Sequence, residues 1–261
     1  MLDHNSQTSC FSDFTESEYL AFLKAAKQHW CFAGYSEYQT NAPTILLRHD
    51  IDISVHRAYT LSKIEAAESI SATYFIMLHG VFYNPLEKET ASIIKEILAM
   101  GHFLGLHFDP EFYGTAIFDK VNLCNRLQFE KNILETIFDT KITAFSWHNP
   151  TVCNMLSVTD SQLAGMINTY GSEVTSKYSY VSDSNGIWRH RSLKSAINEK
   201  TDRFLQILTH PEWWTPEPMA PRDRILRAVN GRAAACMRNY DQLLETHGRP
   251  NIHGPAQGTQ C

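Results

Sequence analysis

Residues 44–52 of this 261-residue chain read TILLRHDID, and their pattern carries the most information about the fold. Thr44 to Leu47 form a short, continuously apolar run with a β-branched residue, as expected of a strand that is buried on both faces. Two carboxylates, Asp50 and Asp52, follow the run almost directly. The stretch therefore predicts a core strand whose C-terminal end delivers two acidic side chains.

Strands and helices alternate along the rest of the chain. A helix is expected over residues 15–27, because apolar residues recur at helical spacing behind a capping box of Thr15 and Glu18. Further strands are expected over residues 71–76, 103–108, 142–147, 177–181 and 204–209, and further helices over 54–68, 87–100, 116–138 and 222–245. This alternation predicts an α/β fold with right-handed crossovers and a parallel sheet, either open or closed into a barrel.

Composition argues against several functional classes. Hydrophobic residues at 43% and charged residues at 20% are typical of a folded globular protein, and a net charge of −5 without a dense basic run argues against nucleic acid as a partner. No apolar stretch reaches the roughly 18 residues of a transmembrane segment. Residues 1–7 lack the features of a secretory signal, so a cytoplasmic location is expected. The six cysteines form no C-x-x-C pair, which argues against a zinc ribbon or a redox motif.

Acidic and histidine side chains follow five of the predicted strands at the points where those strands end. They are Asp50 with Asp52, His107 with Asp109, His148, Asp183 and His210. In parallel α/β folds the C-terminal ends of the strands lie at one edge of the sheet, and active sites are usually found there. The sequence therefore predicts that these side chains share a site.

The residue types at this edge suit a divalent metal. Asp52 and His107 are the best pair of ligands, because carboxylate with neutral imidazole suits zinc, cobalt, nickel, iron or manganese. Asp50 lies two residues from Asp52 and is better placed as a base that takes a proton from water. His210 is the candidate acid that protonates a leaving amine, and Asp183 could hold its imidazole protonated.

Structural roles compete with these functional ones. A lone D-x-D can cap a helix or form a turn, and His49 and His102 are expected to be structural hydrogen-bonding groups. Trp213 could pack in the core or line a sugar-binding rim, and both alternatives stay open here. Cys153 has no evident base beside it, which favours a structural thiol.

Five motifs, spread in order from about Thr44 to Trp214, resemble the polysaccharide deacetylase superfamily, also called the NodB-homology or carbohydrate esterase family four fold. The resemblance makes Asp50 the catalytic base and Asp52 a metal ligand. Residues 101–111, GHFLGLHFDPE, look like the second family motif and place His107 as a ligand. The family's second metal histidine is replaced here by Glu111.

The third, fourth and fifth family motifs are also matched in this sequence, the third with one residue changed. His148-Asn149-Pro150 looks like the family's R-x-P, with histidine where the family has an arginine that orients the base. The third ligand is therefore open among His148, Glu111 and Asp109, with His148 preferred. The fourth motif, an Asp followed by a Trp, is similar to Asp183 with Trp188. The fifth ends in a catalytic histidine, which is His210 here.

The resemblance implies a distorted (β/α) barrel of about seven parallel strands that holds one divalent metal, with zinc expected. The implied reaction removes an N-acyl, acetyl-like group from a sugar, such as a polysaccharide or surface-glycan precursor. Substrate contacts are expected from Trp188, Arg189 and Trp213, and Arg189 with Arg191 could contact a phosphate or carboxylate. The barrel is expected over residues 43–247, between an N-terminal helical segment (1–42) and a flexible tail (248–261).

Two other functions stay open. The first is hydrolysis of another C–N bond, in an amide or ureide that is not a sugar, since one fold serves many substrates. The second is a catalytically silent homologue that binds a glycan or a partner, with Glu111 and His148 as signs of a decayed site.

Overall fold

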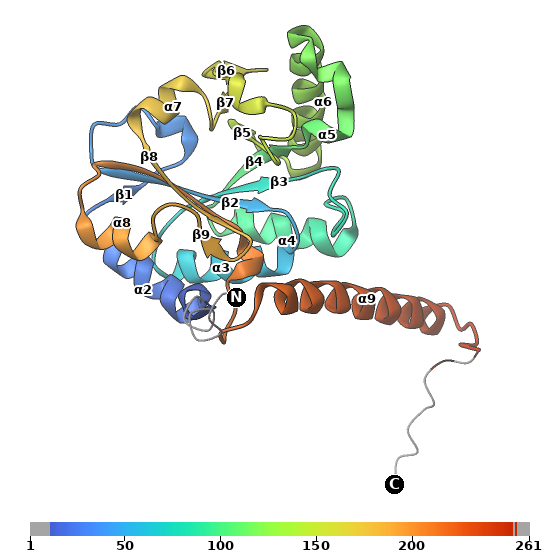
Figure 1. The fold of residues 1–261 in the computed structure, drawn as a ribbon. Helices are drawn as coiled ribbons and strands as arrows, with labels where there is room; N and C mark the ends of the chain where they lie inside the picture. The colour runs from blue at the N-terminus through green and yellow to red at the C-terminus, as the bar shows by residue number, and fades with distance from the viewer. Residues whose placement is uncertain (1–10, 253, 255–261) are drawn as a thin grey trace, which may run out of the picture.

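A computed structural model describes residues 11–252 and 254 of the chain. Figure 1 shows one curled sheet with helices packed around it. The strands are β1 (Cys31–Phe32), β2 (Thr44–Ile51), β3 (Thr73–Ile76), β4 (Phe103–Phe108), β5 (Ala144–Trp147), β6 (Gln162–Leu163), β7 (Met166–Asn168), β8 (Ser179–Ser184), β9 (Ile187–Trp188) and β10 (Phe204–Thr209). The α-helices are α2 (Glu16–Ala26), α3 (Val55–Ala67), α4 (Lys88–Ala99), α5 (Pro110–Tyr113), α6 (Lys120–Phe138), α7 (Ser172–Lys177), α8 (Leu193–Glu199) and α9 (Pro221–Thr246). The 3-10 turns are η1 (Ser12–Phe14), η2 (Tyr35–Glu37), η3 (Gly114–Phe118), η4 (Met155–Ser157) and η5 (Pro211–Trp213).

The sheet has the strand order β6-β7-β5-β4-β3-β2-β10-β8-β9. All neighbours from β7 to β8 are parallel, whereas the two-residue strands β6 and β9 pair antiparallel at the two edges. Strand β1 pairs with the first residues of β2. Within the described residues no pairing joins the two edges, so the sheet forms a half-barrel. The predicted α/β fold with about seven parallel strands is confirmed, in an open form.

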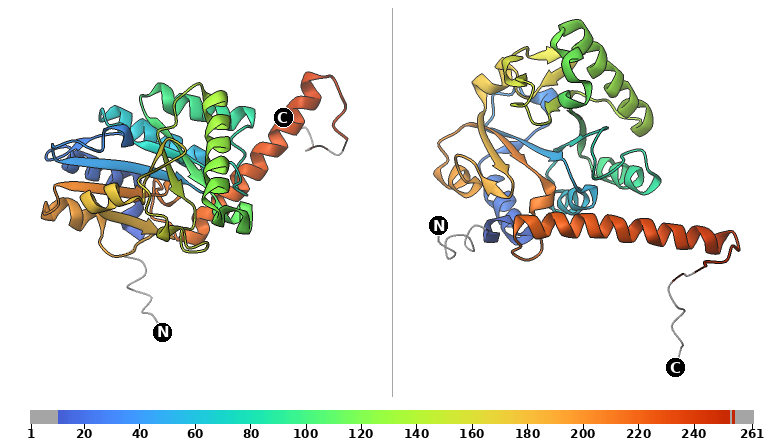
Figure 2. Two further views of the ribbon diagram at one scale, coloured as in Figure 1. Left: turned by 90° about the horizontal axis from the view of Figure 1, so that it is seen from above. Right: turned by 45° about the vertical axis from the view of Figure 1, so that its right-hand side comes forward.

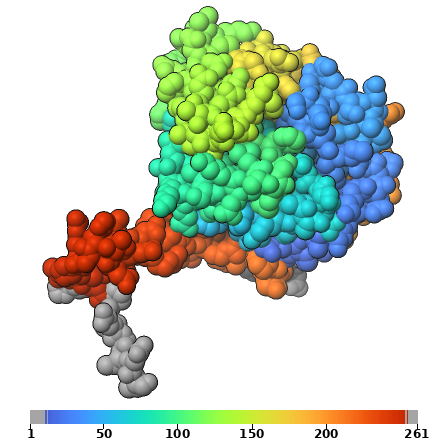
Figure 3. Space-filling model, turned by 180° about the vertical axis from the view of Figure 1, so that it is seen from behind, coloured from blue at the N-terminus to red at the C-terminus, as the bar shows by residue number. Residues whose placement is uncertain are grey.

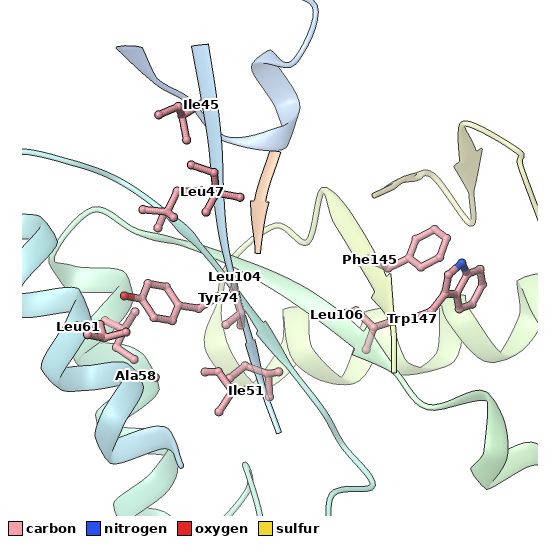
Figure 4. Close-up of a cluster of buried hydrophobic side chains, with 14 of the residues drawn as sticks. Ile45, Leu47, Ile51, Ala58, Leu61, Tyr74, Leu104, Leu106, Phe145 and Trp147 are labelled. Carbon is pink, nitrogen blue, oxygen red and sulfur yellow. The ribbon is translucent and has the colours of Figure 1, made fainter. Parts of the chain in front are cut away.

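Strand β2 lies near the middle of the sheet and is buried along its whole length. Its apolar side chains Ile45, Leu47 and Ile51 belong to the main hydrophobic core, which Figure 4 shows together with Tyr74 of β3. Full burial of one such aliphatic side chain stabilises a fold by about 1.5–3 kcal/mol. This packing fixes the position of the acidic residues at the end of β2.

Short polar contacts set where the helices begin and end. Thr15 caps α2, as predicted, and Ser54 caps α3, each by accepting a hydrogen bond from the backbone N–H three residues later. Gly101 follows α4 with a φ of +91°, the left-handed conformation that favours glycine at a helix end.

Three predicted boundaries were wrong. Strand β2 continues past Leu47 to Ile51, so Asp50 lies within the strand. The helix expected over residues 116–138 begins at Lys120, because the Asp119 carboxylate accepts a hydrogen bond from Asn122 N at 2.9 Å and starts a new helix there. The strand expected over residues 177–181 is displaced, since Lys177 ends α7 and β8 begins at Ser179.

His49 and His102 are structural, as predicted. Both are buried and lie close to the buried Glu65 of α3: His49 Nε2 is 2.6 Å and His102 Nδ1 3.4 Å from its carboxylate. His102 Nε2 also hydrogen-bonds to the Ser62 carbonyl at 2.9 Å. Tyr74 donates a further hydrogen bond to Glu65, so this carboxylate ties α3 to the back of the sheet.

Helix α9 is the longest helix described, with 26 residues. It begins beside η5 and runs past α3 and α4, so that its far end projects from the rest of the molecule (Figures 1 and 2). The space-filling view shows the same projection from behind (Figure 3). No helix among the described residues is both long and apolar enough to cross a membrane. Most of the predicted tail, residues 253 and 255–261, lies outside the described part of the chain.

Candidate active site

The structure brings six of the predicted site residues together at the C-terminal edge of the sheet. They are Asp50 and Asp52 at the end of β2, His107 in β4, His148 directly after β5, Asp183 in β8 and His210 directly after β10. Parallel pairing of these strands brings their ends into one neighbourhood. The alternation of strands and helices therefore predicts the meeting of these residues correctly.

Asp52, His107 and His148 form a compact cluster of possible metal ligands. The carboxylate atom Oδ1 of Asp52 is 3.0 Å from His107 Nε2 and 3.5 Å from His148 Nδ1, and the two ring nitrogens are 3.3 Å apart. A tetrahedral ion bound at about 2.0–2.1 Å keeps its ligand atoms roughly 3.3 Å apart. The three atoms therefore have the spacing that one small divalent ion needs.

The hydrogen bonds around this cluster leave its ligand atoms free to bind a metal ion. His107 Nδ1 hydrogen-bonds to Ser146 Oγ at 2.7 Å, and Ser146 in turn donates to Asp50 Oδ1 at 3.4 Å. Ser146 thus takes the N–H of Nδ1 and leaves the Nε2 lone pair facing Asp52, as is usual for metal-binding histidines. Among the described residues, the buried Asp52 Oδ1 accepts no hydrogen bond. An orphaned buried oxygen facing two ring nitrogens fits a cation bound between the three atoms.

Charges in the cluster favour an ionised carboxylate. Burial opposes the charge of Asp52, but the His107 and His148 imidazoles hold its pKa well below the usual range. Burial likewise opposes the charge of His148, yet the Asp52 carboxylate raises the pKa of this imidazole. Protons and a metal ion therefore compete for His148, because only the neutral ring can bind a metal.

Asp50 lies behind this cluster in a separate buried ion pair. Its Oδ2 accepts a hydrogen bond from Arg48 Nη2 at 2.8 Å, and the two side chains are 0% and 2% exposed. Burial raises the pKa of Asp50, but the Arg48 guanidinium and the neighbouring His107 outweigh burial and lower it. Asp50 is therefore an ionised carboxylate 3.6 Å from the Nδ1 atom of His107.

Arg48 itself is held from several sides. It donates to Thr169 Oγ1 at 2.7 Å and to the Tyr170 hydroxyl at 3.1 Å, and its guanidinium lies 4.9 Å from the Tyr170 ring centroid. Sequence reasoning missed this residue. The available signal was its position two residues before Asp50, which in a strand places both side chains on one face.

His210 and Asp183 form the pair that was predicted. His210 Nδ1 contacts Asp183 Oδ1, and Asp183 Oδ2 accepts hydrogen bonds from Thr209 Oγ1 at 2.6 Å and from the His210 backbone N–H at 3.0 Å. Burial opposes the charge on His210, but the Asp183 carboxylate raises the pKa of the imidazole well above its ordinary value. His210 Nε2 faces Asp52 Oδ2 at 3.7 Å, which directs a proton donor at the cluster.

The two alternative ligands lie outside the cluster. Asp109 caps α5 by accepting a hydrogen bond from Glu111 N at 3.0 Å. Glu111 is exposed on that helix. Within the described residues, only His148 joins Asp52 and His107 in a group of three possible ligands.

The predicted substrate-binding residues lie less centrally. Trp188 pairs with Asp183 across β8 and β9 and stacks on Phe14 with ring centroids 5.0 Å apart. Trp213 is buried in η5, and Arg189 is exposed just after β9. Their roles in binding substrate stay predictions.

Arg191 is tied to neighbouring acidic residues. It forms an ion pair with Asp202 and another with Glu199 at 2.6 Å. Two carboxylates already neutralise this guanidinium, so the expectation that it contacts a phosphate finds no support in the structure.

No family model matches the chain, and no curated protein matches it either. Solved structures do match. A Streptococcus pyogenes deacetylase in complex with acetate has a TM-score of 0.42 and 14% identity, covering 81% of this chain and 85% of that one. The chitin deacetylase from the fungal pathogen Colletotrichum lindemuthianum has a TM-score of 0.43 and 12% identity, covering 74% and 83%.

A carbohydrate esterase family 4 pseudoenzyme from Bacillus anthracis also matches, with a TM-score of 0.41 and 13% identity over 74% of this chain. This chain spans 60% of the length of that pseudoenzyme. At such identities the likeness bears on the fold alone. The Bacillus anthracis pseudoenzyme belongs to carbohydrate esterase family 4, the family that the five motifs resemble.

Proposed function

We propose that this protein is a metal-dependent hydrolase that removes an N-acetyl-like group from a sugar. The observation that carries the proposal is the cluster of Asp52 Oδ1, His107 Nε2 and His148 Nδ1 at 3.0–3.5 Å, beside a buried ionised carboxylate and a charged histidine. A divalent ion held by these three residues would polarise an acyl carbonyl and make a water molecule more acidic.

The surrounding residues supply the two proton transfers that amide hydrolysis needs. Asp50 is ionised at neutral pH, since Arg48 lowers its pKa, and can take a proton from the attacking water. His210 carries its proton because of Asp183, and can pass it to the leaving amine. The base belongs to β2 and the acid follows β10, the strand paired with it, so the two act from different strand ends.

A metal assay with a glycan substrate tests this function. Protein purified without chelator is expected to hold close to one transition-metal ion per chain, and zinc or cobalt at about 100 times Kd should stabilise it by about 2.7 kcal/mol. For a chain of this size that is a rise in Tm of about 5–10 °C. Chitin oligosaccharides are the first substrates to test, because a chitin deacetylase is among the similar structures. Acetate release is the readout.

The third ligand has its own control. We expect His148→Ala to lower metal occupancy and acetate release together, and His190→Ala, an exposed histidine after β9, to change neither. Unchanged occupancy in His148→Ala would move the third ligand to Glu111 or Asp109. Bound metal without acetate release from any glycan would favour a silent binding homologue, and hydrolysis of an amide or ureide that is not a sugar would favour the other C–N hydrolase.

The pH profile tests the acid. Because Asp183 raises the pKa of His210, the Asp183→Asn variant should carry a less basic imidazole, and the alkaline limb of its kcat profile should shift to lower pH by about one unit or more. The direction follows because the protonated imidazole is the active form and is lost as pH rises through its pKa. Asp241→Asn, near the end of α9, is the matched control. An unmoved limb in Asp183→Asn would show that another group donates the proton.

A further inference from the structure

A cavity lies next to the catalytic cluster, between the start of α3, the loop before α4 with the first turn of α4, and the part of α9 from Arg224 to Arg238. Its volume is about 390 Å³, which is large enough for a small ligand group. Its lining begins at Ile53, directly after Asp52, and includes Glu212, two residues after His210. Any molecule held in it is therefore close to the catalytic side chains.

Arginines dominate the wall of this cavity. Arg57 of α3 is joined there by four arginines of α9, namely Arg224, Arg227, Arg232 and Arg238. In the whole chain, acidic residues outnumber Lys and Arg by 28 to 23, so the local excess of positive charge runs against the overall balance. A concentration of guanidinium groups in a hollow is the arrangement that recognises phosphate and carboxylate.

Part of this charge is not neutralised by the protein. Arg57 pairs with Glu16 at 2.6 Å, and Arg232 pairs with Glu87. Arg227 and Arg238, in contrast, have no ion pair with any described residue within 4.0 Å. Burial and the neighbouring Arg57 guanidinium both lower the pKa of Arg227, as expected of two cations placed side by side. A bound anion would remove this repulsion.

The backbone adds to the attraction. Helix α3 has 13 residues, begins at Val55 and points its N-terminus into the cavity, where Ser54, Val55 and His56 are lining residues. The first N–H groups of a helix and its dipole favour negative charge. Arginines from α9 and the N-terminus of α3 therefore line the same cavity.

We infer that this cavity binds the phosphate or diphosphate group of a phosphorylated sugar substrate while the N-acyl group lies at the Asp52 cluster. The link to the substrate rests on the proposed function, but the phosphate site itself does not. A nucleotide carrier and a lipid carrier share this diphosphate chemistry. Only two residues, Ile53 and Ser54, lie between Asp52 and the first residue of α3, so one sugar unit with its attached phosphate can reach both positions.

Calorimetric titration with pyrophosphate tests the site. Metal-free protein is used, because pyrophosphate would chelate a metal ion. The wild-type chain is expected to bind, and Arg227→Ala should weaken binding by about tenfold or more, as expected for loss of a charged hydrogen bond. Arg238→Ala, at an exposed residue, provides a second variant if Arg227→Ala unfolds. Arg222→Ala changes the same charge on the same helix outside this cavity and should retain wild-type affinity within about twofold.

Absence of pyrophosphate binding, or an equal loss in Arg222→Ala, would overturn the inference. UDP and farnesyl diphosphate distinguish the two carriers. Tighter binding of UDP indicates a nucleotide carrier, and tighter binding of farnesyl diphosphate indicates a lipid carrier. The outcome is separable from the proposed function. Deacetylation of neutral chitin oligosaccharides without pyrophosphate binding would overturn only the phosphate site, whereas pyrophosphate binding in a protein that releases no acetate would overturn only the deacetylase.

Discussion

Asp50→Asn is expected to lower kcat by about 10²–10⁴ while the protein keeps its metal, because general bases contribute rate factors of that size. Asparagine has the shape of aspartate and its one oxygen can still accept the hydrogen bond from Arg48, but it cannot take a proton at neutral pH. Metal content per chain and acetate release are measured on the same preparation.

Asp52→Ala is the counterpart of that variant. Its lost carboxylate is the one that faces both His107 and His148, so metal occupancy should fall with activity. The experiment therefore compares the metal occupancy of two variants whose changed carboxylates lie two residues apart. Equal metal loss in both variants would show that the roles of base and ligand are reversed or shared.

Arg48→Met is expected to destabilise the fold by about 3–5 kcal/mol, because it leaves the buried Asp50 carboxylate without its partner. Methionine has an unbranched side chain that fills similar space without charge. For a chain of this size the loss is a fall in Tm of roughly 6–20 °C. Denaturant unfolding at several pH values, followed by circular dichroism, gives the measurement.

The pH dependence of this loss has a definite sign. In the wild type Arg48 keeps the pKa of Asp50 below its unfolded value of about 3.9, so the pair stabilises the fold at neutral pH and less as pH falls through the folded pKa. The gap between wild type and Arg48→Met should therefore narrow as pH falls, beginning above about pH 4, because the unpaired buried Asp50 of the variant takes up a proton at a higher pH than the paired one. Arg48→Met combined with Asp50→Asn should recover part of the stability, because no unpaired charge remains. A constant gap at all pH values would mean that packing and not charge explains the loss.

Much of the candidate site is predictable because it follows from periodicity. An apolar run such as residues 44–47 marks a buried strand, and parallel pairing then brings the ends of β2, β4, β5 and β10 to one edge. Asp52, His107 and His210 could therefore be assigned to one site before their distances were known. The helix start at Lys120 was missed for a local reason, since periodicity continues through Asp119 while a side-chain cap interrupts the helix.

Features that depend on tertiary packing were not accessible in the same way. An arginine inside an apolar strand, such as Arg48, gives no sign of its partners until Thr169 and Tyr170 lie beside it. Trp188 follows an acidic residue at the spacing that the family pattern shows, but its ring packs on Phe14 from the N-terminal segment. The cavity between α3 and α9 joins residues about 170 positions apart, which no local pattern reveals.

The two-residue strands at the ends of the sheet have a consequence for the behaviour of the protein at high concentration. An open sheet normally offers rows of unpaired N–H and C=O groups at its outer strands, where other chains can add and aggregate. Here β6 and β9 finish the sheet as short antiparallel hairpin arms, with room for few intermolecular backbone hydrogen bonds. The half-barrel can thus resist aggregation even though its two edges are not joined by hydrogen bonds.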